Sequence, residues 1–153
     1  MGIEKEIHQG KFRSSGQKAL LNILFTYGWI NERIKNVLAP EDITLQQYNI
    51  LRILRGSFPK PLSTLQIRER MLDRMSDTSR IVDRLVAKGL VKKVVCTKDR
   101  RLVDVTITEK GQNLLKKLDA EVNDMENISK NLTDKEAETI SKLLDKLRDG
   151  AEK

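Results

Sequence analysis

The spacing of the hydrophobic residues changes in the middle of the chain, and this change constrains the fold more than any other feature of the sequence. Up to Gly89 the apolar residues recur every three or four positions, which is typical of amphipathic helices. After Gly89 the period is two, so 91–96 and 102–107 are predicted to be paired strands, with 97–101 as the loop between them. The alternation is regular in the second strand and irregular in the first. We therefore expect a mainly α fold with one small β-hairpin.

Capping residues mark where the helices before the hairpin begin and end. Two capping boxes begin at Thr44 and Ser63, and each predicts a helix start. Ser76 or Asp77 caps the third helix of this group. Gly89 follows that helix at the position where a left-handed backbone suits glycine. Two helices joined by a tight turn and followed by a hairpin form a winged helix-turn-helix.

Long amphipathic helices are predicted on both sides of this unit. One follows Lys18 and ends before Pro40, and two more begin at Thr108 and at a capping box on Thr133. Their apolar stripes cannot all be buried in a small three-helix core, so we expect them to pack on each other and on a second copy of the chain. The expected organisation is a flexible lead-in at 1–17, a single unit at 18–148 with dimerisation helices at 18–39 and 109–148 and a winged-helix lobe at 44–107, and a tail at 149–153.

The positive charge of the chain is concentrated in one segment. The 153 residues include 29 Lys and Arg and 22 Asp and Glu, which gives a net charge of +7. Residues 60–101 hold twelve basic and five acidic residues, so the whole excess lies there. A local basic block indicates a polyanionic partner, and the alternative is a solvated surface with a chance bias in charge. Because the block coincides with the helix-turn-helix and the wing, we expect double-stranded DNA as the partner.

One helix and one loop in this block have the chemistry of DNA readers. The helix after Ser76 is expected to have an apolar face of Ile81, Val82, Leu85 and Val86 and a solvent side that includes Thr78, Ser79, Arg80 and Lys88. An arginine there can bond guanine or hold a phosphate. Such a helix fits the major groove, and an arginine in the wing loop fits a narrow minor groove, where Asp99 could orient it. The alternative for the loop is an exposed turn with a weak surface ion pair. The predicted DNA-binding residues are Ser63, Ser76, Asp77, Thr78, Ser79, Arg80, Arg84, Lys98, Asp99, Arg100 and Arg101.

The residues needed for several other kinds of protein are missing. No nucleophile with a base, carboxylate cluster or phosphate-binding glycine loop is present, so we expect neither an enzyme nor a cofactor. Cys96 is the single cysteine and His8 the single histidine, so we expect no intramolecular disulfide and no Cys/His metal site. No apolar run could span a bilayer, and the first residues lack a signal core. We therefore expect a cytoplasmic protein that does not enter membranes.

Two stretches of the chain resemble the MarR family of bacterial transcriptional regulators. They are RIVDRLVAKGLV at 80–91 and DRRLVDVTITEKG at 99–111. The family's wing pattern, Asp-x-Arg followed by a strand ending in Leu-Thr and then a glycine, falls on these residues, with Ile107 as an apolar departure from the leucine. The resemblance covers about 18–148. It implies a homodimer built from the terminal helices, a recognition helix that starts at Ser76, and Arg101 as the wing arginine supported by Asp99.

The resemblance also implies a small, often phenolic, effector that binds between the dimerisation helices and the DNA-binding lobe and releases DNA. The four candidate aromatic residues for such a pocket are Phe25, Tyr27, Trp29 and Tyr48. The alternative for these side chains is core packing. Redox-sensing members of the family carry a reactive cysteine near the N-terminal helix, whereas Cys96 lies on the first wing strand, where a buried structural role is expected.

Together these features predict a sequence-specific DNA-binding transcriptional regulator that acts as a repressor. We expect it to bind a pseudo-palindromic operator as a homodimer, with one helix in the major groove and the wing in the minor groove. The alternative is a winged-helix protein–protein interaction module without specific DNA binding. The concentration of positive charge on both the helix and the wing favours DNA over that alternative.

Overall fold

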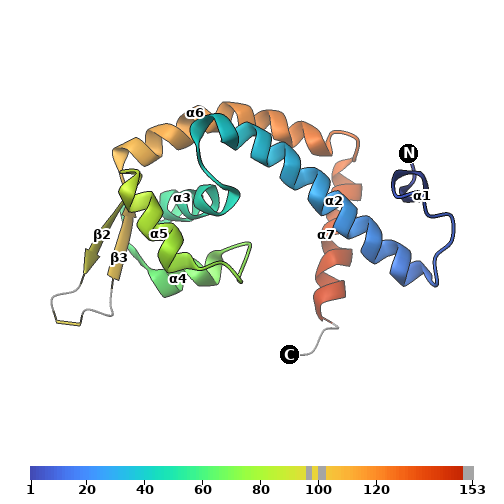
Figure 1. Ribbon diagram of the computed structural model, residues 1–153, viewed down its shortest axis with the longest axis horizontal. Coiled ribbons are helices and arrows are strands. Elements are labelled where there is room, and N and C mark those ends of the chain that lie inside the picture. Colours follow the sequence, from blue (N-terminus) through green and yellow to red (C-terminus); the bar gives the residue numbers. More distant parts are fainter. Residues whose placement is uncertain (96–97, 100–102, 150–153) are drawn as a thin grey trace.

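Two long helices form an arm across the molecule, and most of the other elements lie below this arm (Figure 1). The two long helices are α2 (Ser15–Leu38) and α6 (Glu109–Glu126), and they lie side by side although 70 residues separate them in sequence. The computed structural model describes residues 1–95, 98–99 and 103–149, without the side chains of 122–126. None of the described helices is both long enough and apolar enough to cross a membrane.

A lobe of short helices and one small sheet lies below one end of the arm, on the left of Figure 1. Its helices are α3 (Leu45–Ser57), α4 (Thr64–Arg70) and α5 (Thr78–Ala87). Its strands are β1 (Leu62–Ser63), β2 (Val91–Val95) and β3 (Val103–Ile107), in the antiparallel order β1-β3-β2. This architecture confirms the predicted mainly α fold with a hairpin.

The core of the molecule is the interior of this lobe. Its side chains are mainly aliphatic and come from every element of the lobe, from the end of α2 and from the first half of α6. The apolar area that they bury together stabilises the lobe against the arm. The side chains that are almost completely buried are Leu38, Ile50, Leu51, Leu54, Ile67, Val82, Leu85, Val105, Leu115 and Leu118.

The predicted helix starts are confirmed by the hydrogen bonds of their caps. Thr44 and Ser63 each close a capping box with the residue three positions on. Asp77, and not Ser76, is the N-cap of α5, and its carboxylate accepts from the Arg80 N–H at 3.3 Å. Thr133 exchanges hydrogen bonds with Glu136 at the start of α7 (Asp134–Asp149).

The two predicted strands pair as expected, and the sheet contains a third strand that was not predicted. Val91 pairs with Ile107 and Val95 with Val103, so the regular face of β3 points into the core while most of β2 is exposed. The additional strand is β1, which pairs Leu62 with Val105. A two-residue strand has no detectable period, so only its pairing with β3 reveals it.

The N-terminal segment departs from the expected flexible lead-in. It contains a short helix, α1 (Ile3–Glu6), and α2 begins at Ser15 rather than at Lys18. Ile3 is buried, and Lys18 donates to the Glu4 carboxylate. This hydrogen bond lowers the pKa of Glu4 below its ordinary value. One apolar contact and one ion pair therefore hold α1 near α2, a long-range arrangement that local periodicity cannot indicate.

The junction between the hairpin and α6 is tightly packed. Thr108 accepts from the Gly111 N–H at 3.1 Å, which confirms it as the cap of α6, and its hydroxyl donates to the Gly89 carbonyl at 2.7 Å. A Cβ on Gly111 would lie 2.3 Å from the Leu90 carbonyl oxygen. A side chain is therefore sterically excluded at position 111, because that oxygen belongs to the backbone.

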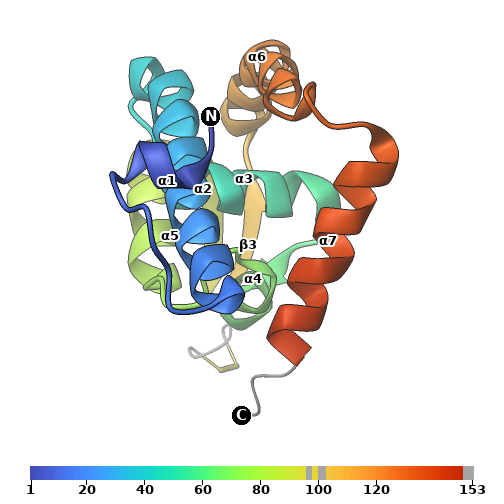
Figure 2. The ribbon, with the colours of Figure 1, turned by 90° about the vertical axis from the view of Figure 1, so that its right-hand side faces the viewer.

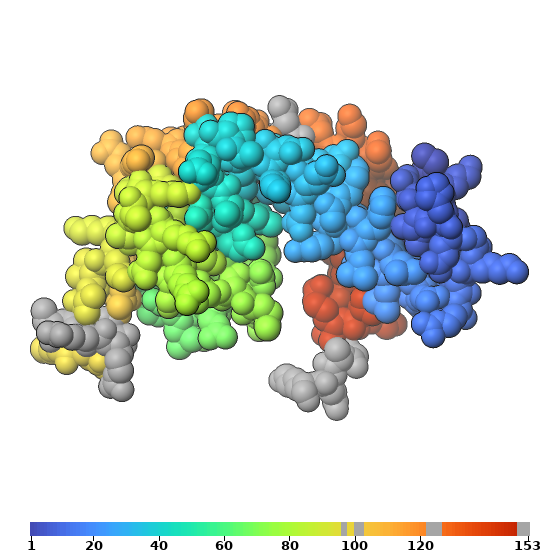
Figure 3. Space-filling model, viewed as in Figure 1, coloured from blue at the N-terminus to red at the C-terminus, as the bar shows by residue number. Residues whose placement is uncertain are grey.

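Helix α7 stands away from the rest of the chain. Figure 2 shows it as a separate rod beside the lobe, and open space separates the two in the space-filling view (Figure 3). Its apolar side chains Ile140, Leu143 and Leu147 are 44%, 60% and 50% exposed. Leu20 and Leu24 of α2 are exposed as well. The chain by itself therefore leaves unburied the stripes that the sequence assigned to packing.

Candidate nucleic-acid interface

Helix α5 presents one face to the core and the opposite face to solvent. Val82 and Leu85 are buried, whereas Ser79, Arg80 and Arg84 are exposed. Gly89 ends the helix with φ of +72°, as predicted for a glycine just beyond a helix end. The cap at one end and the glycine at the other fix the length of the helix, and the buried pair fixes its rotation. The polar side chains of α5 therefore project from the lobe together.

Three assignments on or before α5 require correction. Thr78, expected on the solvent side, is only 4% exposed, and its hydroxyl and that of Ser76 are buried without a hydrogen-bond partner among the described residues. Val86, expected on the apolar face, is 37% exposed. Lys88 was expected on the solvent side, but it is half-buried and its ammonium group lies near Asp42. Thr78 is buried because it is the first residue of the helix and faces α4, a packing contact that helical periodicity does not predict.

Two of the exposed charges of α5, Arg80 and Asp83, are paired with neighbouring charges. Arg80 Nε lies 3.3 Å from the Asp77 carboxylate, and Arg80 is largely exposed. Asp83 accepts from Lys93 of β2 at 2.7 Å, which links the helix to the wing strand. Both pairs are at the surface, so each contributes little to stability. They are available for rearrangement when a phosphate competes for the cation.

The helix before α5 and the turn between them add further exposed cations. Arg68 and Arg70 on α4 and Arg74 in the turn are all exposed. Leu72 and Met75 in the same turn are 84% and 94% exposed, two large apolar side chains that the sequence analysis did not single out. Their turn position within a basic segment was the available signal. Ser63, a predicted contact, is half-buried and is occupied by the capping box of α4.

The wing is described in part. Lys92, Lys93 and Lys98 are exposed, and Asp99 is half-buried. Arg100, Arg101 and Cys96 lie outside the described residues. Of the ten basic residues of 60–101 that the structure describes, nine are exposed and Lys88 is the exception. The charge excess inferred from the sequence is therefore displayed on the surface of α4, α5 and the wing, where a polyanion can reach it.

The four aromatic residues proposed as one ligand pocket do not come together. Tyr48 is buried in the core of the lobe. Phe25 and Trp29 line a hollow on α2 that also includes Ile3 of the N-terminal segment. Tyr27 points elsewhere, into a separate cavity. The alternative of core packing holds for Tyr48 alone among them, since Phe25, Tyr27 and Trp29 are 38%, 61% and 36% exposed.

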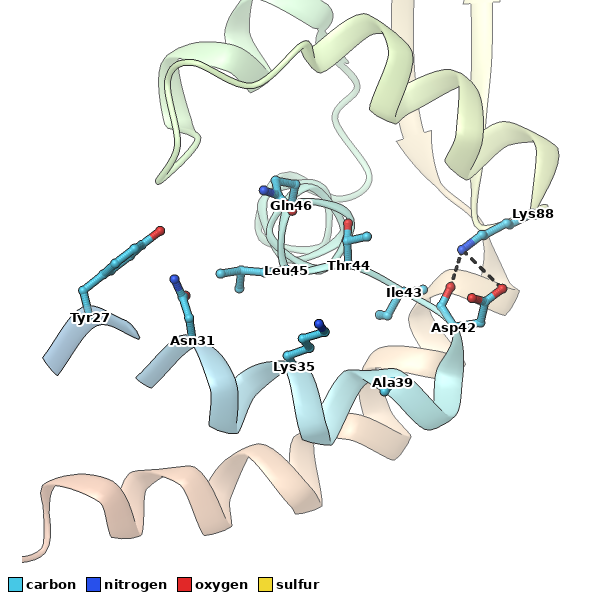
Figure 4. Close-up of a pocket in the computed structure, with 10 residues that line it drawn as sticks. All are labelled: Tyr27, Asn31, Lys35, Ala39, Asp42, Ile43, Thr44, Leu45, Gln46 and Lys88. Carbon is cyan, nitrogen blue, oxygen red and sulfur yellow. Dashed lines mark hydrogen bonds and ion pairs between the residues drawn. The ribbon is translucent and has the colours of Figure 1, made fainter. Parts of the chain in front are cut away.

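The cavity at Tyr27 has a volume of about 480 Å³ and lies between α2 and the start of α3 (Figure 4). Tyr27 lies at one end and Lys88 at the other, with Lys35 pointing in between them. Its lining combines apolar and polar side chains with two cations. The lining residues are Tyr27, Asn31, Lys35, Ala39, Asp42, Ile43, Thr44, Leu45, Gln46 and Lys88. Among the described residues, no group of His, Cys, Asp and Glu side chains could hold a metal ion.

Known proteins share both the sequence and the fold of this chain. A family model described as the MarR family matches residues 41–102. A crystal structure of a MarR transcription factor from Planctomyces limnophilus is 31% identical in sequence, has a TM-score of 0.69, and aligns over 92% of this chain and 100% of its own. This chain belongs to the MarR family.

Two further proteins resemble this MarR-family chain in sequence or in fold. The uncharacterized HTH-type transcriptional regulator YhbI of Bacillus subtilis (strain 168) is 34% identical over 82 residues, which are 53% of this chain and 51% of YhbI, so the match spans about half of YhbI. A mutant MarR from E. coli complexed with operator DNA is 24% identical, has a TM-score of 0.70, and aligns over 96% of this chain and 99% of its own. At that identity the likeness shows the winged-helix fold alone.

Proposed function

We propose that this MarR-family regulator binds a pseudo-palindromic DNA operator as a homodimer and represses transcription without any catalytic step. The observation that carries the proposal is the outward face of α5, where Ser79, Arg80 and Arg84 project together beside the exposed cations of α4 and the wing. A helix with such a face fits the major groove, and its flanking cations fit the phosphates. The related fold of a MarR complexed with operator DNA supports this placement.

The wing contributes the minor-groove contact in this proposal. Lys98 and Asp99 lie at its tip, and the sequence puts two arginines directly after them. An arginine in a narrow minor groove meets an enhanced negative potential, and a neighbouring carboxylate restricts its rotamers. We assign that role to Arg101, with Asp99 as its support. Ser63 and Ser76 contribute through the backbone near the starts of α4 and α5, because the Ser63 hydroxyl caps α4 and the Ser76 hydroxyl is buried.

The homodimer is supported by the apolar side chains that the single chain leaves exposed. The apolar side chains of α7 and of α2 form stripes that are exposed to water in the single chain. The free-energy cost of this exposure is proportional to the apolar area. A second copy of the chain would bury them, with 18–39 and 109–148 as the dimerisation helices. A two-fold dimer would present two α5 helices to half-sites about 34–36 Å apart.

Selection of bound fragments from a random duplex library tests the DNA proposal. We expect a two-fold motif, and binding to it that falls by about 10³–10⁵ between 50 and 200 mM salt if about six to ten phosphates are neutralised. Arg80→Ala should weaken binding to the selected operator more than to random duplex, because it removes a base contact as well as a phosphate contact. Lys116→Ala on α6 removes the same charge away from this face and is the matched control.

The results that contradict the proposal are specific. Equal loss of operator and random-duplex binding in the Arg80 variant would remove the base-reading role of that side chain. Absence of binding to any duplex at low salt would favour the protein–protein interaction module. Repression is tested by transcription in vitro from a promoter that carries the selected operator, where activation in place of inhibition would overturn it.

We also propose that the cavity between α2 and α3 takes a small anionic aromatic effector. Its volume of about 480 Å³ lies in the range of small-molecule sites, and Lys35 extends into it from α2. Tyr27 offers an aromatic face and a hydroxyl group at one end. The cavity adjoins both the arm and the lobe, so an occupant contacts the two parts whose relative position sets the spacing of the reading helices.

Thermal denaturation with a series of aromatic acids tests the effector site. We expect benzoate, but not neutral benzamide, to raise the melting temperature, and Lys35→Met to abolish the increase. Phe25→Ala is the matched control, because Phe25 lines a different hollow. Equal stabilisation by benzoate and benzamide, or an unchanged response in the Lys35 variant, would contradict the assignment.

A further inference from the structure

The C-terminal end of α5 is attached to the junction between the arm and α3 through a single ammonium group. Lys88, the C-cap of α5, donates from Nζ to the backbone carbonyl of Asp42 and to Gln47 Oε1, the latter at 3.2 Å. The Asp42 carboxylate lies 3.8 Å from the same nitrogen. Figure 4 shows this side chain leaning from the end of α5 toward Asp42. One lysine thus spans 41–46 residues of sequence.

The acceptors of this ammonium are already fixed by the structure around them. Asp42 has a left-handed backbone with φ of +53° and closes the short 3₁₀ helix η1 (Ala39–Glu41) that ends the arm. Gln47 is 4% exposed, and its Oε1 also accepts from the Thr44 N–H at 3.2 Å, as part of the capping box of α3. The lysine therefore joins three elements at one point: the end of η1, the start of α3 and the end of α5.

A second set of bonds holds the same end of α5 from the other side. The carbonyls of Lys88 and Gly89 accept from Lys110 Nζ at 2.9 Å and from the Thr108 hydroxyl at 2.7 Å, both at the start of α6. A cation at a helix C-terminus is electrostatically favourable. The end of α5 is thus clamped between the η1–α3 junction and the start of α6, whereas Ser79 and Arg80 lie at the other end.

Clamping one end of a short helix controls where its other end lies. Arg80 lies eight residues before Lys88, about 12 Å along the axis of α5, so a tilt of about 10° at Lys88 moves Arg80 by about 2 Å. A displacement of that size exceeds the tolerance of a hydrogen bond to a base edge. Base contacts at one end therefore depend on the anchor at the other.

We infer that Lys88 is a positioning residue for DNA reading, which fixes the angle of α5 relative to the α2–α3 junction without touching DNA. The inference rests on the proposed function, because it concerns the helix proposed to read the operator. Lys88, the half-buried lysine of the basic block, acts in this inference through the position of α5. Arg80 and Arg84, in contrast, are proposed to contact DNA directly.

Substitution of Lys88 by methionine, arginine and glutamine tests this role. We expect Lys88→Met to weaken operator binding by about tenfold, the scale of one hydrogen bond to a charged group, with an unchanged dependence on salt. Lys88→Gln should lose a similar amount, and Lys88→Arg should recover most of the affinity because it keeps a cationic donor. Lys116→Met is the matched control: it makes the same change at an exposed position of α6, away from the anchor and from the proposed DNA face, so its affinity should stay near wild type.

Hydrogen exchange supplies a readout that does not depend on DNA. The amide protons of Gly89 and Leu90, bonded to Val86 and Leu85, should exchange faster in the methionine variant than in the wild type, while those of Ile50 and Leu51 in α3 serve as the internal reference. Wild-type affinity and exchange in Lys88→Met would overturn the inference. So would a loss of affinity on every duplex with a shallower salt dependence, because that marks a direct phosphate contact. If the wild type binds no duplex, the proposed function fails, and the exchange rates still decide whether Lys88 anchors α5.

Discussion

Arg55 and Asp119 form a two-pronged ion pair that joins α3 of the lobe to α6 of the arm. Arg55 Nη1 donates to Asp119 Oδ2 at 2.8 Å and Nη2 to Oδ1 at 3.2 Å, across 64 residues of sequence. The two side chains are 33% and 44% exposed, so water screens the pair in part. The geometry is that of a planar guanidinium facing a carboxylate, which a lysine cannot reproduce.

Arg55→Lys is expected to lower the free energy of unfolding by up to about 1 kcal/mol, because it keeps the charge and loses one of the two hydrogen bonds. Urea denaturation measures the change, and a double-mutant cycle with Asp119→Asn isolates the coupling. Arg148→Lys is the control, since its pair with Asp145 lies on the exposed surface of α7. A coupling free energy of zero would show that the pair does not hold the lobe to the arm.

Gly111→Ala is expected to destabilise the protein by about 1–3 kcal/mol, since the new Cβ overpacks a site that cannot expand. It would lie 2.3 Å from the Leu90 carbonyl oxygen and 2.7 Å from Ile107 Cγ1. Gly56→Ala on α3 has open space around its Cβ and should be neutral or stabilising by up to about 1 kcal/mol. Urea denaturation of both variants checks the pair of expectations. Similar stabilities for the two would contradict the packing seen at the hairpin.

Asp77→Asn is expected to tighten binding to all duplexes at low salt. Asparagine caps a helix as well as aspartate does, while the change removes a negative charge from the DNA face and releases Arg80. The gain should shrink as salt rises. Asp77→Ala, in contrast, should lose about 0.5–2 kcal/mol of stability with the cap. Fluorescence anisotropy with operator and random duplexes measures affinity. Weaker binding to the operator alone in the asparagine variant would instead show that Asp77 orients Arg80 for a base.

The start of α7 is expected to loosen in acid. The N–H and hydroxyl of Thr133 donate to the Glu136 carboxylate and lower its pKa below the ordinary value of 4.5. A lowered folded pKa contributes stability above the ordinary value, and this contribution is lost as the pH falls through the folded pKa. Thr133→Ala should return the pKa of Glu136 toward 4.5, as followed by NMR titration. Thr139→Ala removes a hydroxyl that donates to the Lys135 carbonyl instead and should leave Glu136 unchanged.

Leu143→Glu is expected to convert the proposed dimer into monomers. Leu143 is 60% exposed in the single chain, and a carboxylate there would have to lose its water on association. Ser141→Glu adds the same charge on another side of α7 and should leave the dimer intact. Sedimentation velocity distinguishes the two species. A wild-type monomer, or a Leu143 variant that stays dimeric, would reject these helices as the interface.

Much of this fold follows from local sequence. The capping boxes at Thr44 and Ser63, the glycine stop at Gly89 and the period of two in β3 each act within a few residues, so their effects could be predicted without a structure. The charge of the interface could be predicted for the same reason, because exposed lysine and arginine remain on the surface whatever the packing. The contacts of individual side chains could not, as Thr78 and the four aromatic residues demonstrate.

The sequence by itself determined the order of the main helices and of the hairpin, the capped starts of those helices, and the basic block that points to a polyanion, but not α1 or β1. Only the tertiary structure decided that Thr78 is buried, that Tyr27 and Tyr48 belong to different surroundings, and that Lys88 reaches Asp42. The physical reason is range. A helix cap is a hydrogen bond between residues three positions apart, and the period of apolar residues can be read over a few positions of sequence. The burial of a side chain and its long-range contacts depend on elements that meet only when the whole chain has folded.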